Sequence, residues 1–455
     1  MGEKMKNSIP KSLLRLAEGC SKPLYLVGGS VRNYLAGFSS SNRIDWDICS
    51  PMPLNEFLTA AEQAGFTVHS VFKNTGTVKL SDHLGEEYEY CSFRSDRYIR
   101  GTHVPVEIYF TDNIAIDARR RDFTANAVYF DMKQGEFVDP LNGISAIKEK
   151  RLTTVAPAEK VFGEDGLRLM RLARFAGTLG FSPDEECLLG AKNNAKLIRD
   201  ITPERIYTEL CAILSADTKY GVQNGHYKGL KILEETGVLA EILPELTLGK
   251  GVAQRADFHK YDVLEHSLRA VYYAEKSVRL AALLHDIGKP LCALRDGNFY
   301  AHPNEGAELA KNVLTRLKAP KNIIERIPAL IEWHMYDLDC RASEQKVKRF
   351  FVNHYPILDE LLKLKQADFS ACMDDLSKAP TCARWEKLLQ ALKAENAPLT
   401  VKELALSGKD LLDAGISPPH ISVLLQKLLL HTVCNPKENT KERLIKLAQS
   451  FDKAL

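Results

Sequence analysis

The chain has 455 residues, 45% of them hydrophobic and 26% charged, and its 61 Lys and Arg nearly balance its 59 Asp and Glu. This length predicts two to four domains with cores of their own, and the ordinary composition excludes a disordered, collagen-like or rod-shaped protein. The formal net charge of +2 excludes a uniformly basic protein, so nucleic acid would have to be bound by local positive patches.

The sequence contains neither a membrane span nor a disulfide framework. No apolar run reaches the roughly 18 residues that cross a bilayer, and the N-terminal segment lacks the apolar core of a signal peptide. The ten Cys are scattered, and no two form a C-x-x-C pair. We therefore expect a cytoplasmic protein with reduced thiols, no membrane partner and no structural zinc cluster.

Short apolar runs separated by turn residues fill the first third of the chain and predict strands. They lie at 23–29, 43–50, 77–80, 88–93, 104–110 and 126–131. From about Val161 the apolar residues recur every three to four positions almost to the end, which predicts helices. We therefore predict an α+β protein in which a mixed β-sheet head with helices precedes a long all-α region of several modules.

A glycine turn follows the first predicted strand. Gly28 and Gly29 stand between an apolar run and a helical pattern, so backbone amides there can approach a phosphate at the helix N-terminus. Arg32 lies one turn into the helix and can reach the same anion. A pair of glycines alone usually marks only a turn, but here two aspartates follow about a dozen residues later.

Asp45 and Asp47 stand two positions apart in the next predicted strand. Strand alternation puts both carboxylates on one face, where a positive ion must balance their charge. Mg²⁺ prefers such oxygen ligands and also binds phosphates. An isolated pair of this kind is usually a solvated strand face, but together with the glycine turn it has the geometry that two-metal nucleotidyl transfer requires.

Several motifs in the same order resemble class II tRNA nucleotidyltransferases and bacterial poly(A) polymerases. The resembling segments are 26–32 (LVGGSVR) with 45–47 (DWD), 117–127 (DARRRDFTANA), 163–175 (GEDGLRLMRLARF) and 202–210 (TPERIYTEL). The resemblance implies a nucleotidyltransferase-type head followed by a helical neck, body and tail. It also implies that Asp45 and Asp47 hold metal and prepare the primer 3′-hydroxyl. Arg121 would contact the triphosphate, together with Gly28, Gly29 and Arg32, and Asp122 would orient its neighbours.

The chain departs from the family pattern at two places. Asn33 stands where the family usually has Asp after the Arg of the first motif. Because that Asp is not one of the metal pair, we expect Asn33 to have a structural capping role. The loop from Phe93 to Pro105 is shorter than usual, and in the family this loop assists the switch from C to A addition.

An acidic pair and three arginines form the second group of candidate residues. Glu164 and Asp165 are expected to open a helix, and Asp165, Arg168, Arg171 and Arg174 follow at every third position. Spacing alone favours a solvated salt-bridge face. However, C and A both carry an exocyclic amine beside a ring nitrogen that accepts hydrogen bonds, whereas U and G reverse this pattern. A carboxylate can accept from the amine while a guanidinium donates to the ring nitrogen, and this pair would select C and A. The resemblance implies this role for Asp165 and Arg168, with Arg171 and Arg174 nearer the phosphates or primer.

A His and Asp set lies in the helical half of the chain. An isolated His on a helix is usually structural, but an adjacent His-Asp pair with further His and a late Asp can hold one or two divalent metals. Residues 256–378 resemble an HD phosphohydrolase domain, and the matching residues are His266, His285, Asp286, His302, His334 and Asp368. The resemblance implies a second divalent-metal site, and both a hydrolase and a purely structural HD module remain open.

We therefore expect four parts: a nucleotidyltransferase head at 1–152, a neck and body at 153–255, an HD domain at 256–378 and a tail at 379–455. The expected function is addition of C, C and A to the 3′ end of tRNA from CTP and ATP with Mg²⁺ and no nucleic-acid template. The alternatives are CC-only or A-only addition, a poly(A) polymerase, and a metal-dependent HD phosphohydrolase whose head only binds RNA. The sequence leaves the oligomeric state open.

Overall fold

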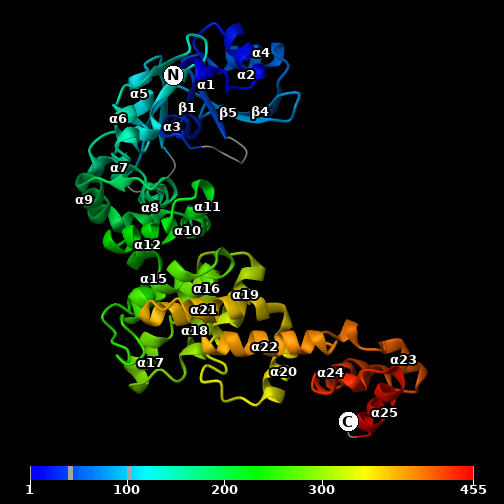
Figure 1. Ribbon diagram of the computed structural model, residues 1–455. Coiled ribbons are helices and arrows are strands. Elements are labelled where there is room, and N and C mark those ends of the chain that lie inside the picture. Colours follow the sequence, from blue (N-terminus) through cyan, green and yellow to red (C-terminus); the bar gives the residue numbers. More distant parts are fainter. Residues whose placement is uncertain (1, 39–44, 100–104, 454–455) are drawn as a thin grey trace. The chain divides into compact units, whose positions relative to one another are not determined.

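A computed structural model of the chain describes residues 2–38, 45–99 and 105–453. The chain divides into two units, Met1–Thr247 and Leu248–Leu455. All strands lie in the first unit, and the described part of the second unit is helical (Figure 1). The predicted α+β class, with a mixed-sheet head and a mostly helical remainder, is confirmed.

The head contains a seven-stranded sheet with the order β3-β4-β5-β2-β1-β8-β9. Its strands are β1 (Tyr25–Val27), β2 (Trp46–Ser50), β3 (Thr67–Phe72), β4 (Thr77–Ser81), β5 (Glu87–Ser92), β8 (Tyr129–Asp131) and β9 (Glu136–Val138). The central strands β2 and β5 pair in parallel, and the other neighbours are antiparallel. Of the two predicted catalytic residues, Asp47 therefore lies on a strand in the middle of the sheet, and Asp45 directly precedes that strand.

Each of the six predicted strand segments overlaps an observed strand. The segment 104–110 forms β7 (Glu107–Phe110), which pairs with β6 (Arg94–Arg97) in a separate ribbon. Residues 43, 44 and 104 of the predicted strands lie outside the described residues. Residues 100–104 of the loop from Phe93 to Pro105 also lie outside them. The unpredicted strands β3 and β9 are the two edges of the sheet, where partly exposed residues give a weak apolar signal.

Helices cover the sheet and join its strands. The head helices are α1 (Gly2–Lys6), α2 (Lys11–Gly19), α3 (Gly29–Ala36), α4 (Leu54–Gln63), α5 (Ile114–Arg119) and α6 (Gly143–Lys148). One core cluster combines Val27 and Cys49 of the central strands with Ala118 of α5 and with Val161 of α7 (Ala158–Glu164), the first helix of the neck. The head and the first neck helix are thus packed around one shared apolar core.

The remainder of the first unit is built around one buried helix, α8 (Leu167–Leu179). The surrounding helices are α7 (Ala158–Glu164), α9 (Glu185–Asn194), α10 (Pro203–Leu214), α11 (Ala216–Tyr220), α12 (Gly225–Glu235), α13 (Val238–Ile242) and α14 (Pro244–Thr247). A short parallel bridge pairs β10 (Arg151–Leu152) with β11 (Ser182–Pro183). A methyl group on Gly177 would lie 2.4 Å from the Gly225 carbonyl oxygen, so glycine allows α8 and α12 to approach closely.

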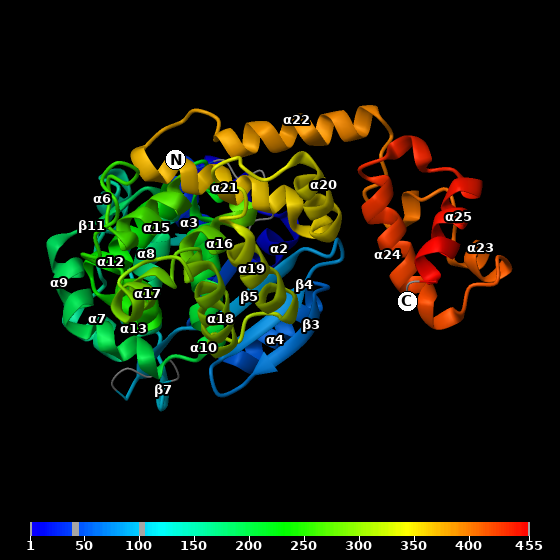
Figure 2. The ribbon, with the colours of Figure 1, turned by 90° about the horizontal axis from the view of Figure 1, so that it is seen from below.

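The second unit begins with a bundle of helices around a group of histidines. These helices are α15 (Val263–Tyr273), α16 (Arg279–Leu284), α17 (Lys289–Asp296), α18 (His302–Arg316), α19 (Lys321–Trp333), α20 (Glu344–Asn353) and α21 (Leu358–Met373). The chain continues through α22 (Pro380–Ala394) to α23 (Gly408–Asp413), α24 (Ile421–Thr432) and α25 (Lys441–Asp452), which form a small group of their own in both views (Figure 2). No described helix is long and apolar enough to cross a membrane.

Candidate active site and metal centre

Three carboxylates meet at one end of the central strands. Asp47 on β2 lies in register with Glu89 on the parallel neighbour β5, and Asp45 stands just before β2. Burial raises the pKa of Asp47 to about 6; Arg121 opposes the shift, and the negative charges of Glu89 and Asp45 add to it. The carboxylates therefore crowd one another, and a divalent cation at this point would relieve their repulsion.

Glu89 was not predicted as a site residue. Its sequence context, an alternating Tyr-Glu-Tyr run, indicates a strand but not which strand lies beside it. Only the parallel pairing of β2 with β5 brings Glu89 next to Asp47. Asp45 is largely exposed, and one of its oxygens lies 3.9 Å from Lys219 Nζ of α11. The head and the neck thus both contribute charged groups to this site.

The predicted glycine turn lies against the carboxylates. Gly28 has φ +74° and precedes α3, and a methyl group there would lie 3.0 Å from Asp47 Oδ2. Only glycine combines this backbone conformation with such a close approach. The N-terminus of α3 therefore opens beside Asp47, as an anion-binding turn requires.

Arg32 is buried behind this turn. Its guanidinium donates to Asn126 Oδ1 and, at 2.9 Å, to Asn33 Oδ1, and it lies 3.8 Å from where a Gly29 side chain would begin. Burial lowers the pKa of Arg32 to about 10, which leaves it charged at neutral pH. Its charge is close to the predicted phosphate position, but these contacts hold it within the framework.

Asn33 links two helices. While its Oδ1 accepts from Arg32, its Nδ2 donates to the Tyr220 hydroxyl at 2.6 Å. An ionised Asp at this position could only accept hydrogen bonds, so the amide uses both of its functions. The capping role expected of Asn33 is not observed, because the cap residues of α3 are Gly28 and Gly37; Asn33 instead bridges α3 to α11.

The buried Asp117 fixes the two arginines, Arg120 and Arg121, that follow α5. Asp117 accepts from Arg120 Nε at 2.7 Å, Arg121 Nη2 at 3.2 Å and the Tyr129 hydroxyl at 2.7 Å. Although burial opposes it, the charge of Arg120 and Arg121 lowers the pKa of Asp117 to about 2. The guanidinium of Arg121 is therefore held beside the carboxylates of the central strands.

Asp122 connects the head to α8. It accepts from Arg171 Nε at 2.7 Å and lies 2.6 Å from Arg171 Nη2, while Asn126 Nδ2 donates to its other oxygen at 2.8 Å. This two-point pair, in which Asp122 is buried and Arg171 partly exposed, ties α8 to the segment that follows α5. Asp122 thus joins Arg171 of α8 to Asn126 of the head.

Three guanidiniums gather around the ring of Phe175. The centres of the Arg32, Arg171 and Arg174 guanidinium groups lie 5.1, 5.1 and 4.5 Å from the ring centroid. Arg174 also pairs with Glu209 of α10 at 2.7 Å. An aromatic ring attracts cations to its faces, so Phe175 helps to concentrate positive charge at the junction of head and neck.

Asp165 and Arg168 lie together, but the helix there begins later than expected. Glu164 ends α7, Asp165 is extended with φ −144°, and α8 starts at Leu167. The expectation that Glu164 and Asp165 open one helix was therefore wrong. The extended backbone lets Asp165 Oδ1 accept from the amide of Leu167, the first residue of α8, at 2.9 Å, while Gly166 is the N-cap of that helix.

Arg168 is almost fully buried and held by three acceptors. It donates to the carbonyl oxygens of Val161 at 3.0 Å and Arg120 at 2.7 Å, and to Glu164 at 3.1 Å. A guanidinium has five N–H donors, so these bonds fix its plane and leave donors for a ligand. The ring of Tyr98, which was not predicted as a site residue, lies 5.6 Å from Arg168.

The six predicted HD residues meet in the second unit. His266 Nε2 lies 3.1 Å from His285 Nε2 and 3.0 Å from Asp368 Oδ1, while His302 Nε2 lies 3.2 Å from His334 Nε2. Asp286 stands between the two groups, with one oxygen 3.3 Å from His266 and His285 and the other 3.3 Å from His302. This donor set fits two divalent cations that share Asp286.

Hydrogen bonds orient three of these rings toward the centre. The Nδ1 atoms of His285, His302 and His334 lie 2.8, 2.6 and 2.6 Å from backbone carbonyl oxygens, which leaves each Nε2 for a metal. Burial and the neighbouring His302 and His285 lower the pKa of His334 to about 3, so this ring is neutral at pH 7. A neutral imidazole is the form that binds metal.

Two further features of the HD centre were not predicted. Lys289 places its ammonium 2.6 Å from Asp286, where it can also reach an anion. A cavity of about 580 Å³ opens beside Asp368, and Phe258, Phe299 and Phe369 are among its mostly apolar walls. The cavity can accommodate a flat apolar group next to the metal centre.

Comparison with known proteins agrees with this arrangement. Family models match at residues 24–153 (poly A polymerase head domain), 180–248 (probable RNA and SrmB-binding site of polymerase A) and 263–368 (HD domain). An A-adding tRNA nucleotidyltransferase of Deinococcus radiodurans is 32% identical over 427 residues, which cover 89% of this chain and 90% of that protein.

Two solved structures share the fold along nearly the whole chain. The CCA-adding enzyme of Bacillus stearothermophilus, solved with CTP, is 24% identical with a TM-score of 0.67 and covers 98% of both chains. The CCA-adding enzyme of Thermotoga maritima, solved with tRNA, is 20% identical with a TM-score of 0.63, covering 99% of this chain and 98% of that one.

The Deinococcus relative spans both units, and the match to the poly A polymerase head domain covers the seven-stranded sheet and the carboxylates Asp45, Asp47 and Glu89. The chain therefore belongs to the tRNA nucleotidyltransferase and poly(A) polymerase family and is a nucleotidyltransferase that carries an HD domain.

Proposed function

We propose that this enzyme adds C, C and A to the 3′ end of tRNA from CTP and ATP, without a nucleic-acid template. The observation that carries this proposal is the meeting of three carboxylates, Asp45, Asp47 and Glu89, with the anchored Arg121 and the buried Asp165–Arg168 group in one unit. The relative named above acts on tRNA, and the two solved relatives bind CTP and tRNA according to their titles.

Nucleotidyltransferases and HD domains both depend on divalent metals. We propose that Mg²⁺ is held in the head by Asp45, Asp47 and Glu89. Such an ion would lower the pKa of the primer hydroxyl and balance the charge of the transferred phosphoryl group. The chain's own part is to position the reactants. Arg121, held by Asp117, and the N-terminus of α3 would orient the triphosphate beside the carboxylates.

We propose that Asp165 and Arg168 select the base. The Asp165 carboxylate would accept from the exocyclic amine that C and A share, while Arg168 would donate to the adjacent ring nitrogen. Because other contacts already fix Arg168, little conformational entropy is lost when a base binds. Arg171 and Arg174, beside Phe175, would contact phosphates of the nucleotide or primer.

Addition of A alone is the second candidate, because the named Deinococcus relative is an A-adding enzyme. One base site that accepts both C and A is compatible with CCA, CC-only or A-only addition. These three activities are therefore distinguished by which tRNA 3′ ends the enzyme extends. Poly(A) synthesis is the remaining alternative; we favour tRNA because the charge of the chain is nearly balanced and it carries an HD domain. We also propose that the chain consists of a head at 1–152, a neck and body at 153–255, an HD domain at 256–378 and a tail at 379–455.

The HD centre supports a further candidate activity, hydrolysis of phosphate esters such as 2′,3′-cyclic or terminal phosphates. The observation that favours it is the complete, inward-facing donor set around Asp286. Two divalent ions bound there would activate water. Lys289 would attract the phosphate, and the apolar cavity would receive the rest of the ester.

The first experiment tests nucleotide addition on three tRNA transcripts, which end before the first C, before the second C and before the A. With CTP and ATP, the purified enzyme should extend all three to the same full-length end, and Asp45→Ala should extend none. Product lengths on a sequencing gel measure the result. Products that stop after the second C, extension of only the third transcript, or long A tails would each contradict complete CCA addition.

The second experiment tests the carboxylate that only the structure located. Glu89→Gln should reduce nucleotide incorporation roughly 10–100-fold at limiting Mg²⁺, because one negative ligand is lost, and high Mg²⁺ should restore part of the rate. The matched control is Glu87→Gln, two positions earlier on the same face of β5. Equal rates for the two variants would remove Glu89 from the metal site.

The third experiment separates the two centres. Asp286→Asn should abolish hydrolysis of 2′,3′-cyclic AMP and leave CCA addition within about twofold of the parent rate, whereas Asp45→Ala should do the reverse. Metal-free enzyme reloaded with Mn²⁺ is assayed for both reactions. If parent enzyme and Asp286→Asn are equally inactive as hydrolases, the HD centre is structural, and the proposed nucleotide addition is unaffected by that result.

A further inference from the structure

The neck places one lysine beside the carboxylates of the head. Lys219, one position before the end of α11, has its Nζ 3.9 Å from Asp45 Oδ2. The side chain of Lys219 is 48% exposed and that of Asp45 is 82% exposed. An ion pair between such exposed groups contributes little to stability. Lys219 can therefore exchange Asp45 for another anion at little cost.

The backbone of Lys219 is fixed, although its ammonium group is not. The next residue, Tyr220, accepts from Asn33 Nδ2 at 2.6 Å, and its ring stacks on that of Phe38 with 4.6 Å between the centroids. Asn33 lies in α3 and Phe38 follows that helix, so the end of α11 is attached to the head. From this fixed point, the flexible four-carbon stem of Lys219 lets its charge turn toward a ligand.

The neighbouring cations of the neck are already held by carboxylates. Arg171 is paired with Asp122, and Arg174 is paired with Glu209. Lys219 has a single ion-pair partner in the part of the chain that the structure describes, and that partner is exposed. A phosphate can therefore take Lys219 without leaving a buried charge behind, which distinguishes it from the two arginines.

The position of Lys219 indicates which phosphate it would meet. In the proposed reaction, Asp45 lies beside the 3′-hydroxyl of the primer. The 3′-hydroxyl and the 5′-phosphate of one nucleotide are joined through a single ribose, so the phosphate of the last nucleotide lies close to Asp45 as well. With a divalent cation on Asp45, the ammonium group would be repelled from the carboxylate and attracted by this phosphate.

We propose that Lys219 binds the phosphodiester that joins the last nucleotide of the primer to the one before it, and that it leaves Asp45 when it does so. The inference rests on the proposed nucleotide addition, because that function brings the 3′ end to Asp45. Lys219 also lies within residues 180–248, which match the family model described as a probable RNA and SrmB-binding site. Lys219 is then a primer-binding residue that comes from the neck, whereas the metal-binding carboxylates belong to the head.

The test compares two tRNAs that end before the A, one natural and one whose last phosphodiester is replaced by an uncharged methylphosphonate. Binding to the full-length enzyme is measured by fluorescence anisotropy with Mg²⁺, without nucleotides and at one salt concentration. The neutral linkage should weaken binding to the parent enzyme roughly 5–20-fold, because a charge-assisted contact is lost. It should weaken binding to Lys219→Gln less than about twofold, because this variant has already lost the contact.

Two further variants make the result specific. Lys196→Gln removes the same charge from another exposed lysine of the segment 180–248, and it should respond to the neutral linkage as the parent does. Lys219→Arg keeps a positive charge and should keep most of the response. Equal responses of the parent and Lys219→Gln would overturn the proposal, as would a response that Lys196→Gln also abolishes. Equal binding of both RNAs by the parent would overturn it even if a variant failed to fold.

Kinetics separate binding of the primer from support of Asp45. In Lys219→Gln, the KM for tRNA should rise roughly 5–20-fold while kcat stays within about twofold, since a binding contact is lost. A fall in kcat at unchanged KM would overturn the proposal, because Lys219 would then only orient Asp45. A parent enzyme that shows the predicted binding but incorporates no nucleotide would refute the proposed function and leave the contact in place.

Discussion

The pair of buried Asp122 with partly exposed Arg171 is the interaction on which the arrangement of the first unit depends. Asp122 belongs to the segment that also carries Arg121, and Arg171 belongs to α8, the central helix of the neck. Removing Arg171 would leave the buried carboxylate of Asp122 without its charged partner, which costs up to about 3–5 kcal/mol where both partners are buried and less here, because Arg171 is partly exposed. The pair therefore holds the catalytic strands and the proposed base-reading helix in one rigid frame.

Apolar packing supports the same connection. Phe123, next to Asp122, meets the ring of Phe175 edge-on at 5.9 Å, and Phe175 in turn lies among three guanidiniums.

The near-zero net charge of the chain is consistent with an enzyme that acts on nucleic acid. Its charges are sorted into carboxylates at one end of β2 and arginines at the junction of head and neck, so the local field is strong although the total charge is small.

Local sequence patterns predicted the strands at the centre of the sheet and the helical remainder. They also picked out the candidate residues in the head and the candidate HD residues in the second unit. This succeeded because each signal, such as the glycine turn at Gly28 or the His285-Asp286 pair, depends on neighbours in the chain. The edge strands β3 and β9 were missed because their partly exposed residues carry little apolar periodicity. The break before α8 was missed because the charge pattern continues through Asp165 although the backbone does not remain helical.

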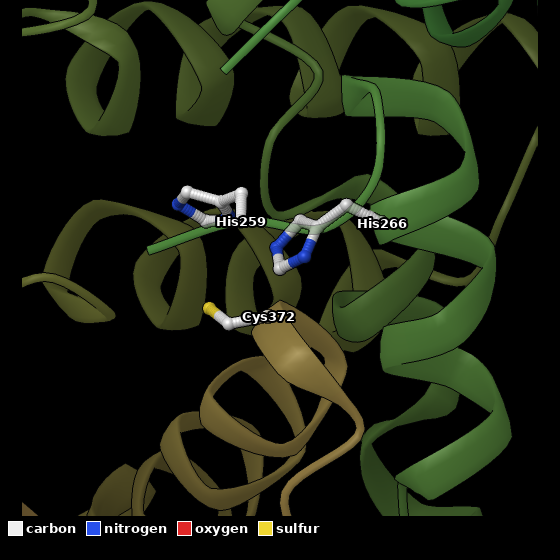
Figure 3. A group of neighbouring side chains, drawn as sticks. All are labelled: His259, His266 and Cys372. Atoms are coloured by element: carbon white, nitrogen blue, oxygen red, sulfur yellow. The ribbon is translucent and has the colours of Figure 1, made fainter. Parts of the chain in front are cut away.

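The remaining site residues depend on contacts between distant segments, which one sequence does not reveal. Glu89 comes to Asp47 only through the pairing of two strands that lie about 40 positions apart in the chain. Tyr98 meets Arg168 from a different ribbon, and Arg32 is turned inward by Asn126. Likewise, nothing in their spacing indicates that His259 and Cys372, which line the cavity, lie beside His266 of the HD centre (Figure 3).

The central claim is that Asp122 and Arg171 act as one unit in positioning α8 for nucleotide addition. The most direct test is a double-mutant cycle of Asp122→Asn and Arg171→Gln, with the Glu209→Gln and Arg174→Gln cycle as a comparison. Rates of nucleotide incorporation are measured for each variant. We predict that the double variant loses little more than either single variant, a coupling of about 1–3 kcal/mol. Strictly additive losses would contradict the account, because the two residues would then act independently.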